Sequence, residues 1–334
     1  MRGKRRNSPE LPDASAGTPE ERRERARQDF TFFRRAYFPH YCLVGGDSRL
    51  HEWLDTELPR MADAPEGVRL AIAAPRGEAK STFVSLFFVL WAVLTGRKHY
   101  ILIIADALEQ AASLLGAVKD ELEFNEALKR DFPGAGKGHV WNVGTVVTPG
   151  NVKIQALGAG KRMRGLRHGP HRPDLIVLDD LENDGNVDKP EQRDKLQSWL
   201  QKTVLNLGAA DGSMDVVYVG TLLHYDSVLA RTLRKPLWKA RTFRSILRWP
   251  DRMDLWDEWE SLLSSRGEAE ARRFYRQHRA KMEAGAEVSW PASRPLYRLM
   301  CLRAEDREAF DSEQQNDPLS ANEAPFNGCI TFWV

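Results

Sequence analysis

The sequence predicts an α/β protein with a mostly parallel sheet flanked by helices. Two observations support this prediction: short apolar runs recur between residues 68 and 247, and stretches of helical spacing separate them. When strands and helices alternate in this way, each helix crosses over the sheet and joins two parallel strands, so helices cover both faces. We expect strands near 68–73, 99–104, 152–157, 174–178, 215–220 and 240–247.

Composition divides the rest of the 334-residue chain. Residues 1–28 combine Gly, Pro, Ser and mixed charge with few large apolar residues, which predicts a disordered tail. Residues 29–62 are aromatic and predict helices packed against a core that spans 63–250. Residues 251–285 are charge-dense and predict a helical subdomain or lid, whereas residues 286–334 show little periodicity and predict a linker.

The segment after the first predicted strand has the layout of a phosphate-binding loop. Residues 74–82 (Ala-Pro-Arg-Gly-Glu-Ala-Lys-Ser-Thr) follow the apolar run and lead into an apolar helix at Phe83–Leu94. Backbone N–H groups and a helix N-terminus in such a loop surround a polyphosphate, because both favour negative charge. The residues predicted to bind nucleotide are Pro75, Arg76, Gly77, Glu78, Ala79, Lys80, Ser81 and Thr82.

Two side chains of this loop have specific predicted roles. Lys80 would reach the β- and γ-phosphates of ATP, and the Ser81 hydroxyl would bind Mg²⁺. The strict pattern G-x-x-x-x-G-K-[ST] has glycines where this chain has Ala74 and Ala79. Because alanine disfavours a positive φ, we expect a negative φ at these alanines. The alternative is a strand–turn–helix whose lysine is merely solvated.

A second predicted strand ends in clustered carboxylates. Residues 174–178 are followed by Asp179, Asp180 and Glu182, and the continuous apolar run predicts a strand buried on both faces. Ligands bind at the carboxyl ends of strands in such sheets. We predict that Asp179 holds the metal and that Asp180 activates the attacking water, with Glu182 as the competitor for that role. The alternative is an Asp-rich loop that caps the next helix.

A third predicted strand, 215–220, ends in Gly220 and Thr221. A hydroxyl at this strand end could sense the γ-phosphate and couple hydrolysis to movement, so we assign both residues to coupling. The three strand ends in this order predict a P-loop NTPase fold of the RecA/ASCE-like type, with ATP and Mg²⁺ as cofactors.

Basic residues gather in two places, although the formal net charge of the chain is only +2. The segment 161–168 contains Arg164 and Arg167, either of which could act as an arginine finger on the γ-phosphate of a neighbouring subunit. Contact with DNA phosphates is the rival role. The second cluster, between residues 231 and 252, is interpreted as a solvated face.

Together these motifs resemble the ATPase domain of the large terminase subunit of tailed bacteriophages. The resemblance covers roughly residues 30 to 326 and includes Arg-Gly-Leu-Arg at 164–167, the run from Arg172 to Asp180, and Val-Gly-Thr at 219–221 with the His224 and Asp226-Ser227 that follow. It extends to Phe-Asp-Ser-Glu-Gln-Gln-Asn-Asp-Pro at 310–318, which is similar to the segment that closes the ATPase half in this family.

The resemblance implies a motor subunit that hydrolyses ATP with Mg²⁺ and moves double-stranded DNA into a procapsid, in the host cytoplasm. Implied partners are the portal protein, a small terminase subunit and further copies of the chain in a ring. An arginine early in the loop, here Arg76, is typical of these motors and is assigned a catalytic role. His51 or Phe38 could hold the adenine. Because the chain stops at Val334, where the family's nuclease domain would begin, we expect no nuclease activity from it.

The sequence leaves two alternative functions open. A helicase-like ATPase would share the loop and the carboxylates, but the residues after Leu247 are too few for a second RecA-like domain. A truncated prophage remnant would bind nucleotide without turnover.

The three cysteines, Cys42, Cys301 and Cys329, show no pairing or metal spacing. No apolar run in the sequence is long enough to span a membrane.

Overall fold

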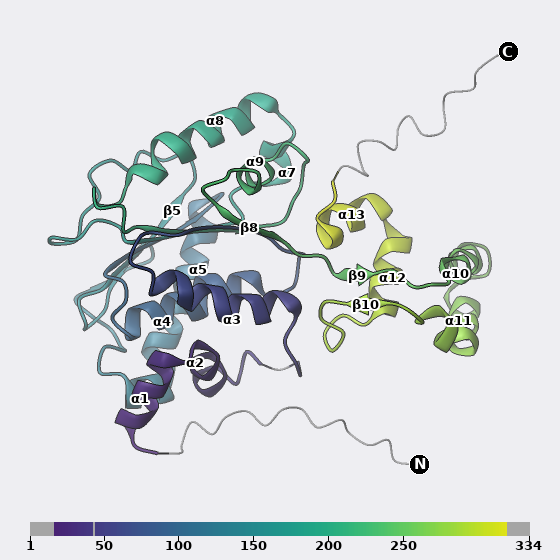
Figure 1. Ribbon diagram of the computed structural model, residues 1–334, viewed down its shortest axis with the longest axis horizontal. Helices are drawn as coiled ribbons and strands as arrows, with labels where there is room; N and C mark the ends of the chain where they lie inside the picture. Colours follow the sequence, from purple (N-terminus) through teal and green to yellow (C-terminus); the bar gives the residue numbers. More distant parts are fainter. Residues whose placement is uncertain (1–16, 43, 319–334) are drawn as a thin grey trace.

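A computed structural model describes residues 17–42 and 44–318, which form a large α/β unit and a smaller, mostly helical C-terminal unit (Figure 1). In the α/β unit the strands are β1 (Arg69–Ala73), β2 (Tyr100–Ala105), β3 (Val140–Trp141), β4 (Thr145–Val147), β5 (Lys153–Gly158), β6 (Leu175–Asp179), β7 (Asp215–Gly220) and β8 (Lys239–Thr242). Its helices are α1 (Pro19–Gln28), α2 (Phe30–Tyr37), α3 (Arg49–Ala62), η1 (Thr82–Phe88), α4 (Val89–Leu94), α5 (Leu108–Phe124), α6 (Glu126–Asp131), α7 (Asp184–Val187), α8 (Pro190–Lys202), η2 (Val204–Asn206) and α9 (Val228–Leu233).

The eight strands form one sheet in the order β3-β4-β5-β2-β6-β7-β1-β8. The six strands from β5 to β8 in this order run parallel to one another, whereas β4, near one edge, pairs antiparallel with both β5 and β3. The predicted fold class, α/β with a mostly parallel sheet flanked by helices, is therefore confirmed. Because β7 lies between β1 and β6, the strand ends that carry the three predicted motifs are adjacent.

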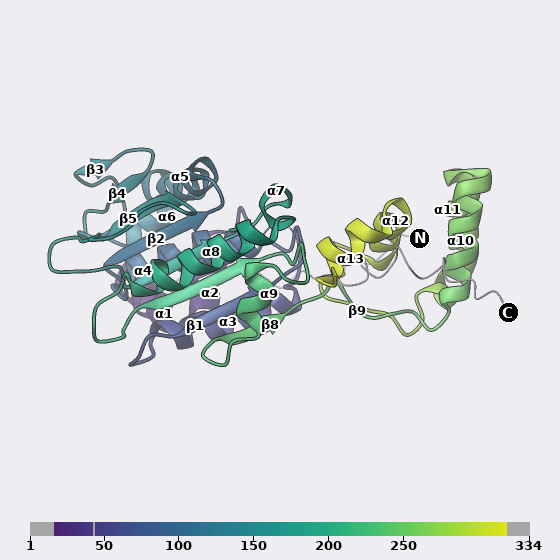
Figure 2. The ribbon, with the colours of Figure 1, turned by 90° about the horizontal axis from the view of Figure 1, so that it is seen from above.

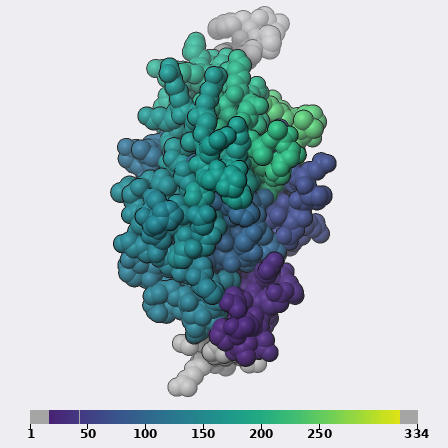
Figure 3. Space-filling view, turned by 90° about the vertical axis from the view of Figure 1, so that its left-hand side faces the viewer, coloured from purple at the N-terminus to yellow at the C-terminus, as the bar shows by residue number. Residues whose placement is uncertain are grey.

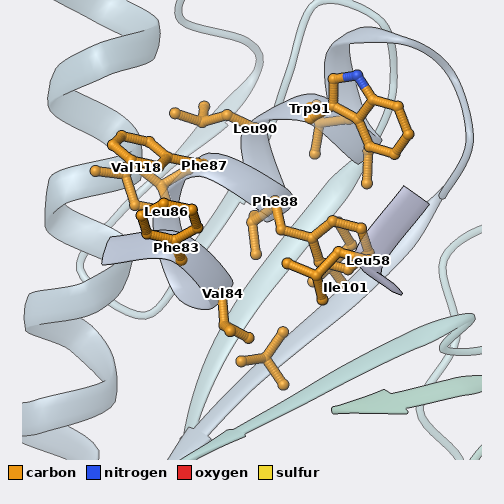
Figure 4. Close-up of a cluster of buried hydrophobic side chains, with 14 of the residues drawn as sticks. Leu58, Phe83, Val84, Leu86, Phe87, Phe88, Leu90, Trp91, Ile101 and Val118 are labelled. Atoms are coloured by element: carbon orange, nitrogen blue, oxygen red, sulfur yellow. The ribbon is translucent and has the colours of Figure 1, made fainter. Parts of the chain in front are cut away.

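Alternate side chains of the central strands enter two separate cores, as the two-residue period of a strand requires. On one face, Ile101 and Ile103 of β2 pack with α2, α3, η1, α4 and α5. On the other face, Leu102 and Ile104 pack with α8, η2 and α9. Figure 1 shows these two helical layers below and above the sheet, and Figure 4 shows part of the first core, with Phe83 and Phe87 beside Val118 of α5.

The predicted apolar helix at Phe83–Leu94 is present, but its first part is wider than an α-helix. Helical geometry begins at Lys80, and residues Thr82–Phe88 form a π-helix before α4 continues to Leu94. Single π-turns inside helices occur frequently at functional sites. This one directly follows the predicted phosphate-binding loop.

The prediction of a disordered tail over residues 1–28 is wrong for the part that the structure describes. Residues 19–28 form α1, which Thr18 caps together with Glu21 in a reciprocal capping box. Arg22 of α1 donates to both oxygens of the fully buried Asp131, at 2.5 and 2.7 Å. Figure 3 views the end of the molecule where α1, in purple, packs at the lower edge of the α/β unit.

The aromatic residues of the region 29–62 mostly pack into the first core, as predicted. Phe30, Phe32, Phe33, Tyr37 and Phe38 are each no more than 4% exposed. Tyr41 departs from the prediction, because 42% of its surface is exposed.

The C-terminal unit contains β9 (Ile246–Arg248), α10 (Met253–Arg266), α11 (Glu268–Met282), β10 (Glu287–Val288), α12 (Leu296–Glu305) and α13 (Arg307–Gln315). These elements share one apolar cluster around Trp256 and Trp259. Figure 2 shows α13 next to the α/β unit, whereas α10 and α11 lie at the end farthest from the sheet. The predicted strand 240–247 is split, since β8 joins the large sheet and β9 pairs with β10. The predicted linker from residue 286 contains α12 and α13 in its described part.

Over the described residues, no helix is both long enough and apolar enough to cross a membrane. Cys42 and Cys301 are free thiols. Cys329 lies outside the described residues.

Candidate nucleotide-binding site

The loop between β1 and η1 has an unusual backbone at two positions. Gly77 has a φ of +79°, which glycine adopts without steric cost. Ala79 has a φ of +56°, so the expectation of a negative φ at this alanine is wrong, whereas Ala74 is not among the residues with positive φ. The helix starts one residue later, and the carbonyl of Ala79 accepts a bond from the N–H of Phe83. The chain thus keeps the loop geometry that favours glycine at position 79 and accepts the strain of an alanine there.

Lys80 joins the ends of all three motif strands. Its ammonium group donates to Thr221 Oγ1 at 3.2 Å and forms an ion pair with Asp180 Oδ2 at 3.3 Å. Thr221 Oγ1 in turn donates to the carbonyl of Ala74 at 3.3 Å. Although the lysine is only 7% exposed, its charge therefore reaches the predicted water-activating carboxylate and the predicted coupling hydroxyl.

Asp179 lies below the loop at the end of β6 and is 1% exposed. It accepts hydrogen bonds from Ser81 Oγ at 2.9 Å and from Ser85 Oγ at 2.5 Å. Burial and the neighbouring Asp180 charge raise the pKa of Asp179 to about 6, against the lowering effect of the two hydroxyls and Lys80. A buried carboxylate whose charge is disfavoured gains most from a nearby cation.

The pair of Ser81 and Asp179 fits the chemistry of a magnesium site. Magnesium prefers hard oxygen ligands and is commonly bound through one or two protein groups together with phosphate oxygens and water. The described residues include no group of three or more His, Cys, Asp or Glu side chains that could hold a metal ion. Ser81 Oγ and the Asp179 carboxylate are the oxygens that would hold Mg²⁺ here, beside a bound triphosphate.

Asp180 and Glu182, the two candidates for water activation, have different surroundings. Asp180 has a φ of +46°, and its side chain is 32% exposed beside Lys80. Glu182 accepts from the N–H groups of Val228 and Leu229, at 2.6 and 3.0 Å, and from the Tyr218 hydroxyl at 3.1 Å. Burial raises the pKa of Glu182, although these donors oppose the effect. Its carboxylate is therefore engaged in holding the start of α9, whereas that of Asp180 faces the cavity.

A cavity of about 170 Å³ opens above these groups. Its wall includes charged side chains of both signs: Arg76, Lys80, Asp106, Asp180, Glu182, Asp184 and Glu313. Arg76 Nη1 forms an ion pair with Glu313 Oε1 at 2.8 Å, and the Arg76 N–H donates to the carbonyl of Glu313 at 2.9 Å. Glu313 belongs to α13 and was not predicted as a site residue, although the sequence signal was present in the 310–318 motif.

The outer side of the loop rests on the C-terminal unit. A side chain added at Gly77 would lie 1.8 Å from Nη2 of Arg294. Glu78, which is 1% exposed, accepts from Ser289 Oγ at 3.2 Å, and burial raises the pKa of Glu78. The loop is therefore fixed between the sheet and this unit.

The two residues proposed to hold adenine are both buried. His51 is 2% exposed, and its Nε2 lies 2.9 Å from the carbonyl of Glu78 while its ring stacks on Phe83. Phe38 is fully buried and packs on Phe87. In this arrangement His51 supports the loop and Phe38 belongs to the core, so neither is placed to contact a base.

The predicted arginine finger is not part of the cavity wall. Arg164 and Arg167 are exposed in the loop between β5 and β6, which Met163 anchors in the second core. Within the second basic cluster, Arg231 pairs with Asp226 and Asp194. Exposure leaves the arginines of 161–168 available to another molecule but assigns them no partner.

Comparison with known proteins gives the following. No family model matches the chain, and no curated protein matches it. Among solved structures, the chain is similar to the large terminase ATPase domain of Thermus phage P74-26, with 14% sequence identity and a TM-score of 0.39, over 78% of this chain and 92% of that one. A mutant of the same domain gives 14% identity and a TM-score of 0.38, over 76% and 90%.

Proposed function

We propose that this chain is an Mg²⁺-dependent ATPase of the terminase large-subunit type. The observation that supports this most directly is the convergence of Lys80, Asp180 and Thr221 from three adjacent strand ends, above the pair of Ser81 and Asp179. Transfer of a phosphoryl group to water requires a cation for the phosphates, a base for the water and oxygen ligands for the metal. Lys80 can serve as the cation, Asp180 as the base, and the Asp179 carboxylate with the Ser81 hydroxyl as the ligands.

The geometry suggests how these residues act. In the structure the Lys80 ammonium group pairs with the Asp180 carboxylate. When the Lys80 ammonium turns to the phosphates of bound ATP, Asp180 loses its counter-charge and can accept the proton of the attacking water. Ser81 and Asp179 would hold Mg²⁺, which would neutralise part of the phosphate charge when bound. The Thr221 hydroxyl is hydrogen-bonded to both the Lys80 ammonium group and the Ala74 carbonyl. A movement of Lys80 on phosphate binding or hydrolysis would therefore shift Thr221 and the end of β7, which directly precedes it.

The finer assignments belong to the same proposal. ATP turnover would drive movement of double-stranded DNA into a procapsid, by a ring of these subunits at the portal protein with a small terminase subunit as partner, in the host cytoplasm. Arg76 would contact the phosphates in the same subunit, and Arg164 would act across a subunit boundary. Both depend on the resemblance of the motifs, and both can be tested separately from ATP hydrolysis.

The test is ATP hydrolysis by the purified chain, with and without Mg²⁺ and double-stranded DNA. Lys80→Ala removes the cation and is expected to abolish turnover. Asp180→Asn is expected to retain nucleotide binding and lose hydrolysis, whereas the matched neutralisation Glu182→Gln is expected to retain hydrolysis. Loss of turnover in Glu182→Gln with full activity in Asp180→Asn would reverse the assignment. Equal turnover in the wild type and Lys80→Ala would refute the site.

A further inference from the structure

The end of α13 contacts three strand ends around the nucleotide cavity. Its contacts come from three nearly consecutive residues, Glu313, Gln314 and Asn316. Their hydrogen-bond partners are Arg76 in the phosphate loop, Ser245 after β8, Arg294 before α12, Leu222 after β7 and Phe243 after β8. This segment is the 310–318 motif that the sequence singled out, and the proposed ATPase chemistry leaves it without a role.

Glu313 is the member of this segment whose carboxylate enters the cavity wall. Its side chain is 21% exposed, and Asp180 and Asp184 add negative charge near it. Burial raises the pKa of Glu313, the two aspartates add to the rise, and Arg76 and Lys80 oppose it. An anionic group thus lies beside the two cations that are expected to receive phosphate.

We propose that the Glu313 carboxylate takes the place of a phosphate group at Arg76 when no nucleotide is bound, and that ATP displaces it from Arg76 and loosens the contacts of α13 with the sheet. The inference rests on the proposed nucleotide site. The Arg76 side chain is 73% exposed, and an ion pair so exposed is weak. A triphosphate offers Arg76 more charge and a bidentate contact, so it outcompetes the carboxylate. The Glu313 carboxylate is then left beside phosphate and the aspartates, and repulsion drives it outward.

The experiment compares ATP binding to the full chain and to Glu313→Gln by calorimetry, with Mg²⁺ and with a chelator. Glutamine keeps the size and an acceptor but removes the charge. We expect Glu313→Gln to bind ATP roughly threefold to tenfold more tightly in both conditions, because the competing anion is gone. Glu308→Gln, an exposed neutralisation on the same helix, is the control and is expected to leave affinity unchanged. Hydrogen exchange at the Ser245 amide, which donates to Gln314, is expected to speed up when ATP binds to the wild type.

Each outcome decides between specific readings. Unchanged or weaker binding in Glu313→Gln would overturn the inference, and weakening only with Mg²⁺ would make Glu313 a metal ligand instead. Unchanged exchange at Ser245 would refute the release of α13. If the wild type binds ATP, Lys80→Ala does not, and Glu313→Gln binds with unchanged affinity, this inference is refuted while the proposed ATPase site is supported. A wild-type chain that binds no ATP would refute both.

Discussion

The strained alanine in the loop between β1 and η1 gives a prediction of unusual sign, because a substitution there is expected to stabilise the protein. Ala79→Gly is expected to stabilise the protein, although most substitutions destabilise. A left-handed φ costs an L-residue about 1–2 kcal/mol, and Ala79 has a φ of +56°. Glycine removes that cost but adds about 0.5–1 kcal/mol through its greater freedom in the unfolded chain. The net gain is about 0.5–1 kcal/mol, which corresponds to a rise in Tm of about 1–4 °C.

The assay is thermal unfolding without nucleotide, followed by urea denaturation to obtain the free energy directly. Ala74→Gly is the matched control at the other end of the loop. Ala74 is fully buried and has no positive φ, so the control is expected to lose about 1–2 kcal/mol from the deleted methyl group and the added freedom. If the two variants are destabilised alike, the strain at Ala79 does not exist and the reasoning fails.

Three further predictions concern other parts of the molecule. Asp131→Asn is expected to lower the free energy of unfolding by about 3 kcal/mol at pH 7, since it removes the negative charge that pairs with the buried guanidinium of Arg22. Hydrogen bonds lower the pKa of Asp131 despite its burial. The ionised carboxylate therefore stabilises the folded protein above pH 4, and this contribution is lost as the pH falls further. The difference in the free energy of unfolding between Asp131→Asn and the wild type, measured by urea titration, is expected to narrow below pH 4. Gly77→Ala is expected to weaken ATP binding and lower Tm, because a φ of +79° strains an alanine and its methyl group would have to displace the guanidinium of Arg294, whose Nη2 lies 1.8 Å away. Mixing Arg164→Ala with Lys80→Ala subunits is expected to restore some ATPase activity, measured by phosphate release, if Arg164 acts in trans.

Controls separate these effects from simpler ones. Gly96→Ala introduces the same backbone strain, at a φ of +73°, but its methyl group meets nothing within 4 Å. It should therefore lower Tm and spare ATP binding. Equal weakening of ATP binding by both glycine variants would show that backbone strain alone explains Gly77→Ala. An Asp131→Asn deficit that stays constant from pH 7 to pH 3 would contradict the charge-based account. Mixed subunits that remain inactive would argue against Arg164 acting in trans.

The features that were predicted correctly from the sequence are those that a local pattern of residues determines. The strands β1, β2, β5, β6 and β7 were predicted within about a residue of their bounds, because each is a short run of apolar residues. The loop and the carboxylates were proposed as a nucleotide site because their residue types and spacing are specific. By contrast, β3 and β4, of two and three residues, are too short to show a period.

The missed features depend on contacts between distant parts of the chain. Arg76 and Glu313 are 237 positions apart, and neither residue signals the other. Residues 19–28 are polar and were read as disordered, yet the buried carboxylate of Asp131, 109 positions from Arg22, anchors them. The backbone of Ala79 was mispredicted from its residue type, because the surrounding loop imposes a conformation that alanine alone avoids.

The position of Asn316 also has a mechanical consequence. Two residues beyond it the described chain ends, and Asn316 itself is 5% exposed, bonded to the N–H of Leu222 and to the carbonyl of Phe243. A load pulling on the chain beyond residue 318 would therefore not stretch the helical unit first. It would act directly on the ends of β7 and β8, the two strands that flank β1, so tension would enter the molecule close to the loop that follows β1.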